Sequence, residues 1–255
     1  MSGGHLQRLY RPGETPVHRL PPHCKLVALV AFVLVVVATP RGQFWAFGAY
    51  AALLAAVAAV ARVPPQLIAR RMVVEVPFVG FALLLPFIAQ GERIDVLGVA
   101  VSQPGLLAAW NILAKATLGV IASILLAATT EPRALLLGFE RLRLPGVIVQ
   151  IATFMVRYID VVLDEMRRMR IAREARGFRP RDLRDAGVLA KSAGALFIRS
   201  YERGERVYLA MLSRGYAGAM PVTAQVRADP AQWAAAAALP VAALVVAASA
   251  WLVGT

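Results

Sequence analysis

The sequence of 255 residues is poor in cysteine and lysine, and each shortage excludes a class of protein. The single cysteine, Cys24, cannot form an intrachain disulfide. The three lysines follow Cys24, Ala114 and Ala190, so none completes the Gly-Lys-[Ser/Thr] sequence that holds phosphates in a P-loop. The chain therefore has no Walker A motif with which to drive a process by ATP hydrolysis itself.

Catalytic and metal-binding motifs are also missing. The sequence has no Gly-x-Ser-x-Gly and no His-Glu-x-x-His, and its paired acids Asp164-Glu165 are adjacent rather than convergent. His5, His18, His23 and Cys24 gather near the N-terminus, but their spacings match no standard metal site. We therefore predict no enzymatic activity, no cofactor and no metal site.

Hydrophobic residues, in contrast, make up 59% of the chain, and the mean hydropathy is +0.63. Soluble domains are about 45–50% apolar, so this composition indicates a membrane protein. An all-α integral membrane protein with about five transmembrane helices is predicted, because a span needs about 17–25 residues. The candidate spans are Lys25–Thr39, Phe44–Ala61, Val73–Gln90, Gly105–Thr129 and Trp233–Val253.

The net charge of +13 is unevenly distributed along the chain. The basic residues concentrate in alternate connections, and residues 131–230 alone hold 18 basic and 11 acidic side chains. Because Lys and Arg resist translocation, this bias predicts a cytoplasmic N-terminus and an external C-terminus. A nucleic-acid partner is not expected, because no recognised motif accompanies the charge. Four regions follow: a cytoplasmic tail (1–24), four spans (25–130), a cytoplasmic insertion (131–230) and a last span (231–255).

The insertion is predicted to be helical. Apolar residues recur at intervals of three and four over Pro145–Arg176, and again from Asp182, taken as an N-cap, to Arg214. A shorter amphipathic helix is expected over Pro132–Leu144. Ala190 and Gly194 form a small-xxx-small pair, which lets another helix approach closely. We expect two long amphipathic helices that cross.

Both long helices end on the same pattern, Ala175-Arg176-Gly177-Phe178 and Ser213-Arg214-Gly215-Tyr216. One Arg-Gly ending is ordinary, because glycine stops helices and arginine complements the negative end of the helix dipole. Two copies indicate more, since a guanidinium on a rigid helix end can pair bidentately with a carboxylate in a partner's groove. Two identical arginine endings predict two identical grooves on the partner, as a dimer would supply.

Polar groups within the predicted spans are further candidates for function. Asn111 and Lys115 lie one turn apart in the fourth span, where desolvation is costly. Lys115 either contacts a partner subunit or faces a water-filled crevice, and the sequence leaves both open.

These endings resemble those of the transmembrane T component of energy-coupling factor (ECF) transporters. Three more stretches are similar to its cobalt-transport branch, the CbiQ type: His18-Arg19-Leu20-Pro21, Thr39-Pro40-Arg41-Gly42 and the run from Arg199 to Met211 (RSYERGERVYLAM). The resemblance extends from about Pro16 to Gly218. Ser213 stands where the first copy has alanine, and it is still small.

The resemblance implies a non-catalytic, multi-pass subunit of an ATP-driven importer in the bacterial cell (inner) membrane. Two cytoplasmic ABC-type ATPases would receive Arg176 and Arg214, within the coupling sites Ala175-Arg176-Gly177 and Ser213-Arg214-Gly215. A separate membrane subunit, an S component of the metal type, would bind cobalt or nickel, and residues 131–230 would be the cytoplasmic helical coupling domain.

Two alternatives remain open. The first is a T component for a vitamin, which a neighbouring gene for a vitamin-type S component would indicate. The second, of a different class, is a self-sufficient channel or facilitator. A channel has little use for about a hundred residues of insertion with an exposed apolar stripe, so we favour the importer.

Overall fold

The computed structural model describes residues 10–89, 93–96, 99–178, 182, 185–218 and 228–254. The chain divides into two compact units. The bundle unit comprises residues 7–142 and 226–255, and the two-helix unit comprises residues 143–225 together with residues 1–6.

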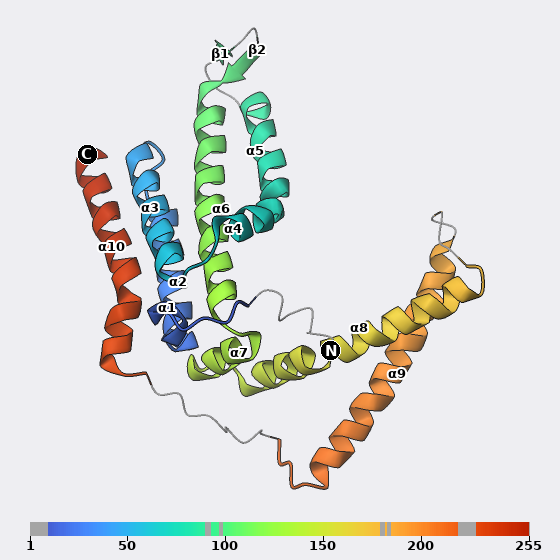
Figure 1. Ribbon diagram of the computed structural model, residues 1–255. Helices are drawn as coiled ribbons and strands as arrows, with labels where there is room; N and C mark the ends of the chain where they lie inside the picture. The colour runs from blue at the N-terminus through green and yellow to red at the C-terminus, as the bar shows by residue number, and fades with distance from the viewer. Residues whose placement is uncertain are drawn as a thin grey trace. The chain divides into compact units, whose positions relative to one another are not determined.

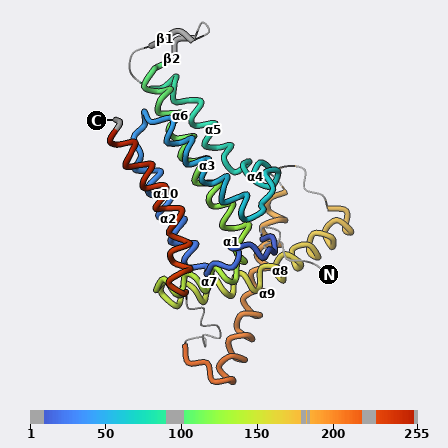
Figure 2. The backbone as a smooth tube through the Cα atoms, turned by 60° about the vertical axis from the view of Figure 1, so that its left-hand side comes forward, coloured from blue at the N-terminus to red at the C-terminus, as the bar shows by residue number. Residues whose placement is uncertain are grey.

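The bundle unit is built from helices that run side by side (Figure 1 and Figure 2). Neighbouring helices are α2 with α10 and α6, α3 with α6 and α10, and α5 with α6. The elements, in chain order, are α1 (Pro16–Arg19), α2 (Pro22–Ala38), α3 (Phe44–Val60), α4 (Pro65–Arg71), the 3-10 helix η1 (Met72–Glu75), α5 (Val76–Ile88), β1 (Arg93–Val96), β2 (Val99–Ser102), α6 (Gln103–Thr129), α7 (Pro132–Arg141) and α10 (Pro230–Gly254).

The prediction of a multi-pass α-helical membrane protein is confirmed, and each predicted span coincides with an apolar helix of this unit. The spanning candidates by length and composition are Pro65–Ile88, Gln103–Thr129, Pro230–Leu252 and, in the other unit, Gly146–Ala175. Helices α2 and α3 are shorter, with 17 residues each. The third run begins earlier than Val73, because the helical path is continuous from Pro65 through η1.

A short antiparallel hairpin joins α5 to α6 and was not predicted. Strand β1 pairs with β2 so that Arg93 lies opposite Ser102 and Val96 opposite Val99. Alternation over so few residues gives too weak a pattern to distinguish a strand from a loop. The Ser102 hydroxyl then accepts a hydrogen bond from the Gly105 amide (3.4 Å) and caps α6.

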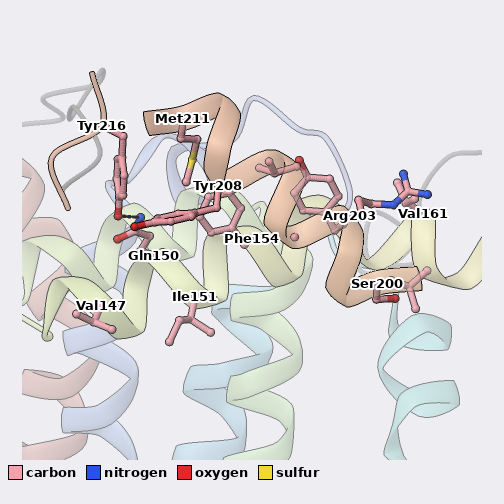
Figure 3. Close-up of a pocket in the computed structure, with 14 residues that line it drawn as sticks. Val147, Gln150, Ile151, Phe154, Val161, Ser200, Arg203, Tyr208, Met211 and Tyr216 are labelled. Atoms are coloured by element: carbon pink, nitrogen blue, oxygen red, sulfur yellow. Dashed lines mark hydrogen bonds between the residues drawn. The ribbon is translucent and has the colours of Figure 1, made fainter. Parts of the chain in front are cut away.

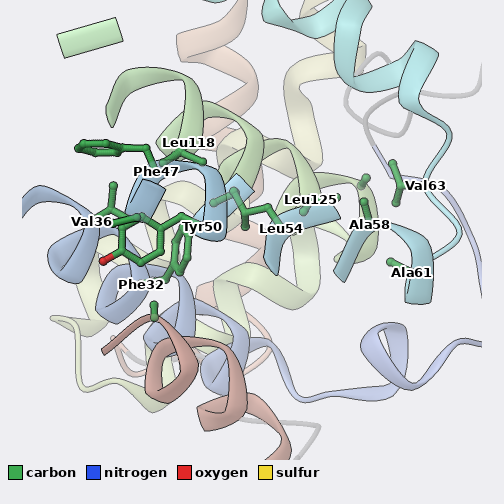
Figure 4. Close-up of a cluster of buried hydrophobic side chains, with 14 of the residues drawn as sticks. Phe32, Val36, Phe47, Tyr50, Leu54, Ala58, Ala61, Val63, Leu118 and Leu125 are labelled. Carbon is green, nitrogen blue, oxygen red and sulfur yellow. The ribbon is translucent and has the colours of Figure 1, made fainter. Parts of the chain in front are cut away.

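The core of the bundle unit is formed by aromatic and aliphatic side chains of α2, α3, α6 and α10 (Figure 4). Tyr50 and Phe32 are completely buried, and their rings meet edge to face with centroids 6.0 Å apart. The Tyr50 hydroxyl hydrogen-bonds with the hydroxyl of Thr39 (2.8 Å), which follows α2 directly. This bond satisfies both polar groups inside the apolar core and fixes the turn from α2 into α3.

The first turn of α2 packs against α7, and a glycine makes the approach possible. A Cβ built on Gly138 would lie 3.1 Å from the backbone nitrogen of His23 and 3.1 Å from the Pro22 Cβ. The segment predicted over Pro132–Leu144 is thus a helix that packs within the bundle unit.

The two-helix unit consists of α8 (Gly146–Ala175) and α9 (Ala186–Leu212). The two helices cross, as predicted (Figure 1). They are antiparallel, since Gln150 bonds to Tyr216 at one end and Glu165 pairs with Arg199 further along. The prediction of Asp182 as the N-cap of α9 was wrong, since the helix begins at Ala186. The Asp185 carboxylate accepts a bond from the Asp182 amide (3.4 Å), which places a turn before the helix.

Candidate functional site

The ending of α8 is a Schellman motif, a helix stop defined by two backbone hydrogen bonds. The Phe178 amide donates to the Arg173 carbonyl (3.1 Å), and the Gly177 amide donates to the Glu174 carbonyl (3.0 Å). Gly177 has φ +78°, the left-handed conformation that this motif requires and that favours glycine. Arg176, the residue just before it, is the C-cap.

The ending of α9 has the same geometry. The Tyr216 amide donates to the Met211 carbonyl (3.0 Å), the Gly215 amide donates to the Leu212 carbonyl (3.0 Å), and Gly215 has φ +83°. Arg214 therefore occupies the same position in this motif that Arg176 occupies in the first. The repeated sequence specifies a repeated three-dimensional arrangement.

Both arginines are exposed at their helix ends. No described residue forms an ion pair or a hydrogen bond with either guanidinium. Arg199 on α9, in contrast, forms an ion pair with Glu165 on α8. Arg176 and Arg214 thus present planar, charged groups from fixed backbone positions.

The aromatic residues after the glycines have a structural reason that the sequence analysis missed. Phe178 and Tyr216 follow the left-handed glycine, where an apolar side chain commonly packs back on the last helical turn. Tyr216 and Met211 line the same groove, and Gln150 donates a hydrogen bond to the Tyr216 hydroxyl (Figure 3). The end of α9 is thereby attached to the first turns of α8, while Gln150 itself gave no signal in the sequence.

A groove of about 410 Å³ lies between α8 and α9 (Figure 3). Its lining is almost wholly apolar and aromatic, and Val147, Ile151 and Tyr208 contribute to it although each is more than half exposed. The small pair on α9 lies apart from it, and a Cβ on Gly194 would meet nothing within 4 Å. Ala190 is likewise exposed, so the described structure leaves this small-residue face open.

Lys115 has partners within the bundle unit that the sequence did not predict. Its ammonium donates to the carbonyls of Val37 (2.7 Å) and Thr39 (3.0 Å) at the end of α2. The positive charge satisfies carbonyls that a helix end leaves free and complements the helix dipole. Asn111, one turn away, is 9% exposed, and its Oδ1 is buried without a hydrogen-bond partner among the described residues.

Lys25 acts in the same way at the other end of the bundle unit. It is 8% exposed and donates to the carbonyls of His18 (3.2 Å) and Thr129 (2.9 Å) and to the hydroxyl of Thr130 (3.2 Å). All three ammonium protons therefore have acceptors, which is what burial of a lysine requires. The charge caps α6 just before the chain enters α7.

The histidines near the start of the first predicted span have different partners. His18 bonds to Thr15 and to the Arg11 carbonyl, whereas the His23 ring meets Trp233 with centroids 5.6 Å apart. Cys24 is completely buried, and His5 lies outside the described residues. Within the described residues no three His, Cys, Asp or Glu side chains group as metal ligands.

Comparison with known proteins gives the family. The family model CbiQ, described as cobalt transport protein, matches residues 13–226. The energy-coupling factor transporter transmembrane protein EcfT of Bacillus selenitireducens is 29% identical over 227 residues, which cover 82% of each chain. EcfT of Bacillus subtilis is 25% identical over 225 residues, or 82% of this chain and 83% of that protein.

An uncharacterized protein of Methanocaldococcus jannaschii, MJ1571, is 28% identical over 158 residues. The match covers 58% of this chain and 54% of MJ1571, so the chain spans about half the length of that relative. With the family model matched over most of its length, and with transmembrane ECF components similar to it over four fifths of it, the chain belongs to the CbiQ family and is a homologue of the ECF transporter T component.

Proposed function

We propose that this chain is the non-catalytic T component of an ATP-driven ECF importer and that Arg176 and Arg214 bind two ABC-type ATPase subunits. The observation that supports this proposal is that the two arginines occupy equivalent positions in two equivalent helix endings. Equivalent positions present the same guanidinium geometry, and a pair of like ATPases would offer the same acceptor groove twice. The rest of the site, Ala175, Gly177, Ser213 and Gly215, keeps each guanidinium clear of bulky neighbours.

The backbone around each arginine favours this role. The Schellman hydrogen bonds hold the last turn, so little backbone entropy is lost when a partner binds. A guanidinium that no described residue engages is available for two parallel hydrogen bonds to a carboxylate. The hypothesis places α8 and α9 in the cytoplasm, as the basic bias of residues 131–230 predicts.

The substrate is inferred to be cobalt or a related divalent ion such as nickel. The matching family model is described as a cobalt transport protein, and the motifs quoted from the sequence resemble that branch. The ion would be held by a separate metal-type S component in the cell membrane. Lys115, Ala190 and Gly194 are the positions we propose for contact with a partner subunit. The open surface around Gly194 supports this for α9, whereas the ammonium of Lys115 already bonds to the end of α2.

Co-purification tests the coupling role. The tagged chain is expressed in its own host, extracted in mild detergent and compared with the Arg176→Glu, Arg214→Glu double variant by mass spectrometry. If each charge pair is buried in the complex, its reversal costs about 2–5 kcal/mol, so ATPase binding weakens by at least about 25-fold. We expect the wild type to retain an ATPase and a small membrane protein, and the variant to lose the ATPase.

A matched control reverses two other exposed arginines on the same helices, Arg167 on α8 and Arg206 on α9. The control carries the same change in net charge but leaves both helix endings intact, so it should retain the ATPase. Equal ATPase recovery from all three proteins would contradict the coupling role and leave the endings as helix caps. Metal uptake by the purified chain alone in vesicles, without ATP, would instead support the channel alternative.

A further inference from the structure

A cavity of about 480 Å³ in the bundle unit lies against the end of α3 and is independent of the coupling site. One wall is the chain from Arg11 to Pro16 with His18, and the other is the turn from Val60 to Val63. The two basic side chains that line it are Arg11 and Arg62. The cavity is therefore a polar site at the point where an apolar helix ends.

Arg62 is held in a backbone conformation that normally selects glycine. The end of α3 is also a Schellman motif, with the Val63 amide donating to Ala58 (2.9 Å) and the Arg62 amide donating to Ala59 (3.0 Å). Arg62 has φ +53° at the position where Gly177 and Gly215 stand in the other two motifs. An arginine there strains the backbone where glycine does not, and residues kept in such conformations concentrate at functional sites. Arg62 therefore combines this strained conformation with a place in the lining of the cavity, whereas the other left-handed arginine among the described residues, Arg143, lies outside the lining.

The opposite wall is organised around the His18 ring. The ring Nε2 bonds to the Arg11 carbonyl (3.1 Å), which can only accept, so Nε2 carries the proton. In the neutral ring Nδ1 then accepts from the Thr15 hydroxyl (2.6 Å). The chain packs so closely here that a Cβ on Gly13 would lie 2.9 Å from the ring. The Arg11 amide donates to the Ala128 carbonyl (3.0 Å), which ties this wall to α6.

The charge of the cavity comes from its two arginines. Burial lowers the pKa of His18 below its usual 6.5, and the nearby Lys25 charge lowers it further, against the bond to the Arg11 carbonyl. His18 is therefore neutral at pH 7. The one acidic side chain of the lining, Glu14, pairs with Arg19 (3.8 Å). Among the described residues none forms an ion pair with Arg11 or Arg62.

The depth of the cavity identifies the anion that suits it. The apolar run of α3 ends at Val60, and the charged side chains begin at Arg62, so the cavity lies at the level of the headgroups if α3 spans the membrane. Basic pockets between transmembrane helices on the cytoplasmic side bind anionic lipid headgroups. The connection that begins at Arg62 also carries Arg70 and Arg71, and this basic bias predicts that it lies on that side. We propose that this cavity binds the phosphate of an anionic phospholipid, with the guanidiniums of Arg11 and Arg62 as its ligands.

The test uses the full-length chain in nanodiscs of phosphatidylcholine, with or without phosphatidylglycerol. Bound phosphatidylglycerol is counted by native mass spectrometry, and thermal unfolding is followed by circular dichroism. We expect phosphatidylglycerol to raise the unfolding temperature of the wild type. Arg62→Gly should bind this lipid about tenfold more weakly, because one charge-assisted contact is lost. In pure phosphatidylcholine it should be as stable as the wild type or more so, because glycine relieves the strain.

Arg143→Gly is the matched control. Arg143 is also left-handed, with φ +60°, but it does not line the cavity. Its replacement should leave the response to phosphatidylglycerol unchanged. A second variant, Arg11→Gln, should weaken lipid binding without touching the backbone of α3.

Two results would overturn the proposal. Phosphatidylglycerol binding by Arg62→Gly equal to that of the wild type would exclude Arg62 as a ligand. Stabilisation of the detergent-solubilised chain by inorganic phosphate alone, as large as that by the lipid, would replace the lipid with a soluble phosphate compound. Neither result depends on ATPase binding, so failure here and failure of the coupling role are distinguishable.

Discussion

The two units of this chain differ most in what they bury. The bundle unit has a core in which Phe32, Tyr50 and Leu54 are no more than 1% exposed. In the two-helix unit only Val149 is buried among the described residues of α8, and none is buried in the described α9. Burial of apolar area is the main favourable term in folding, and most helices in proteins depend on it. The bundle unit is thus stabilised by its own core, whereas α8 and α9 bury almost none of their own apolar surface among the described residues.

Large apolar side chains are exposed along α9. Phe197 is 70% exposed, Leu209 63% and Tyr201 60%. Extended apolar patches of this kind mark sites of interaction with proteins or membranes. The difference between the units therefore lies in the buried core, which the bundle unit has and which the described α8 and α9 lack.

The largest difference in unfolding free energy should be between truncation of an aromatic in the core and truncation of an exposed aromatic on α9. Tyr50→Ala removes a fully buried ring and its hydrogen bond to the Thr39 hydroxyl, so we expect a loss of about 3–5 kcal/mol in the free energy of unfolding. Phe197→Ala should change it by less than about 0.5 kcal/mol. Denaturant unfolding of the purified chain in detergent, followed by circular dichroism, measures both. Equal losses would mean that the face of α9 is packed in the isolated chain.

A smaller effect is expected from the buried lysine that caps α6. Lys25→Met removes the ammonium that donates to the Thr129 carbonyl and the Thr130 hydroxyl. This loss should lower the unfolding free energy by about 1–3 kcal/mol. Lys191→Met removes the same charge from an exposed position on α9 and should change it little. The same unfolding experiment compares them. A Lys25→Met protein as stable as the wild type would show that water or rearrangement satisfies these acceptors.

The smallest effect should have opposite signs in the two units. Gly138→Ala brings a Cβ within 3.1 Å of α2 backbone and should lose up to about 2 kcal/mol of unfolding free energy. Gly194→Ala meets open space and should stabilise α9 by about 0.5–1 kcal/mol, because alanine favours helix. Thermal unfolding of both variants checks the signs. Weaker recovery of a partner with Gly194→Ala, despite the added stability, would identify Gly194 as a contact with that partner.

Much of the fold could be predicted because its signals are local. The apolar runs over Phe44–Ala61 and Gly105–Thr129 coincide with helices to within two residues, since length and composition alone identify such segments. The hairpin between α5 and α6 could not be predicted from its short strands. The start of α9 was misplaced because Asp182 has the composition of an N-cap, while the carboxylate that closes the turn belongs to Asp185.

The candidate site was predictable for the same reason. Gly177 and Gly215 end their helices through hydrogen bonds that span only five residues, so the sequence pattern carries the geometry. Gln150 could not be predicted from the sequence, because its hydrogen bond to Tyr216 joins positions 66 residues apart and no local sequence pattern indicates it.

The sequence by itself determined that this chain is a multi-pass helical membrane protein and that two of its helices end alike. The cost of desolvating the backbone in lipid and the backbone preference of glycine act within single segments. The spanning helices and the two helix endings are therefore specified without any other part of the chain. Only the tertiary structure decided that Lys25 caps a helix end 104 residues away and Lys115 one 78 residues away, and that Arg11 and Arg62 share a cavity. Those contacts depend on the packing of separate helices, which satisfies buried polar groups across the bundle and brings charges from distant positions together.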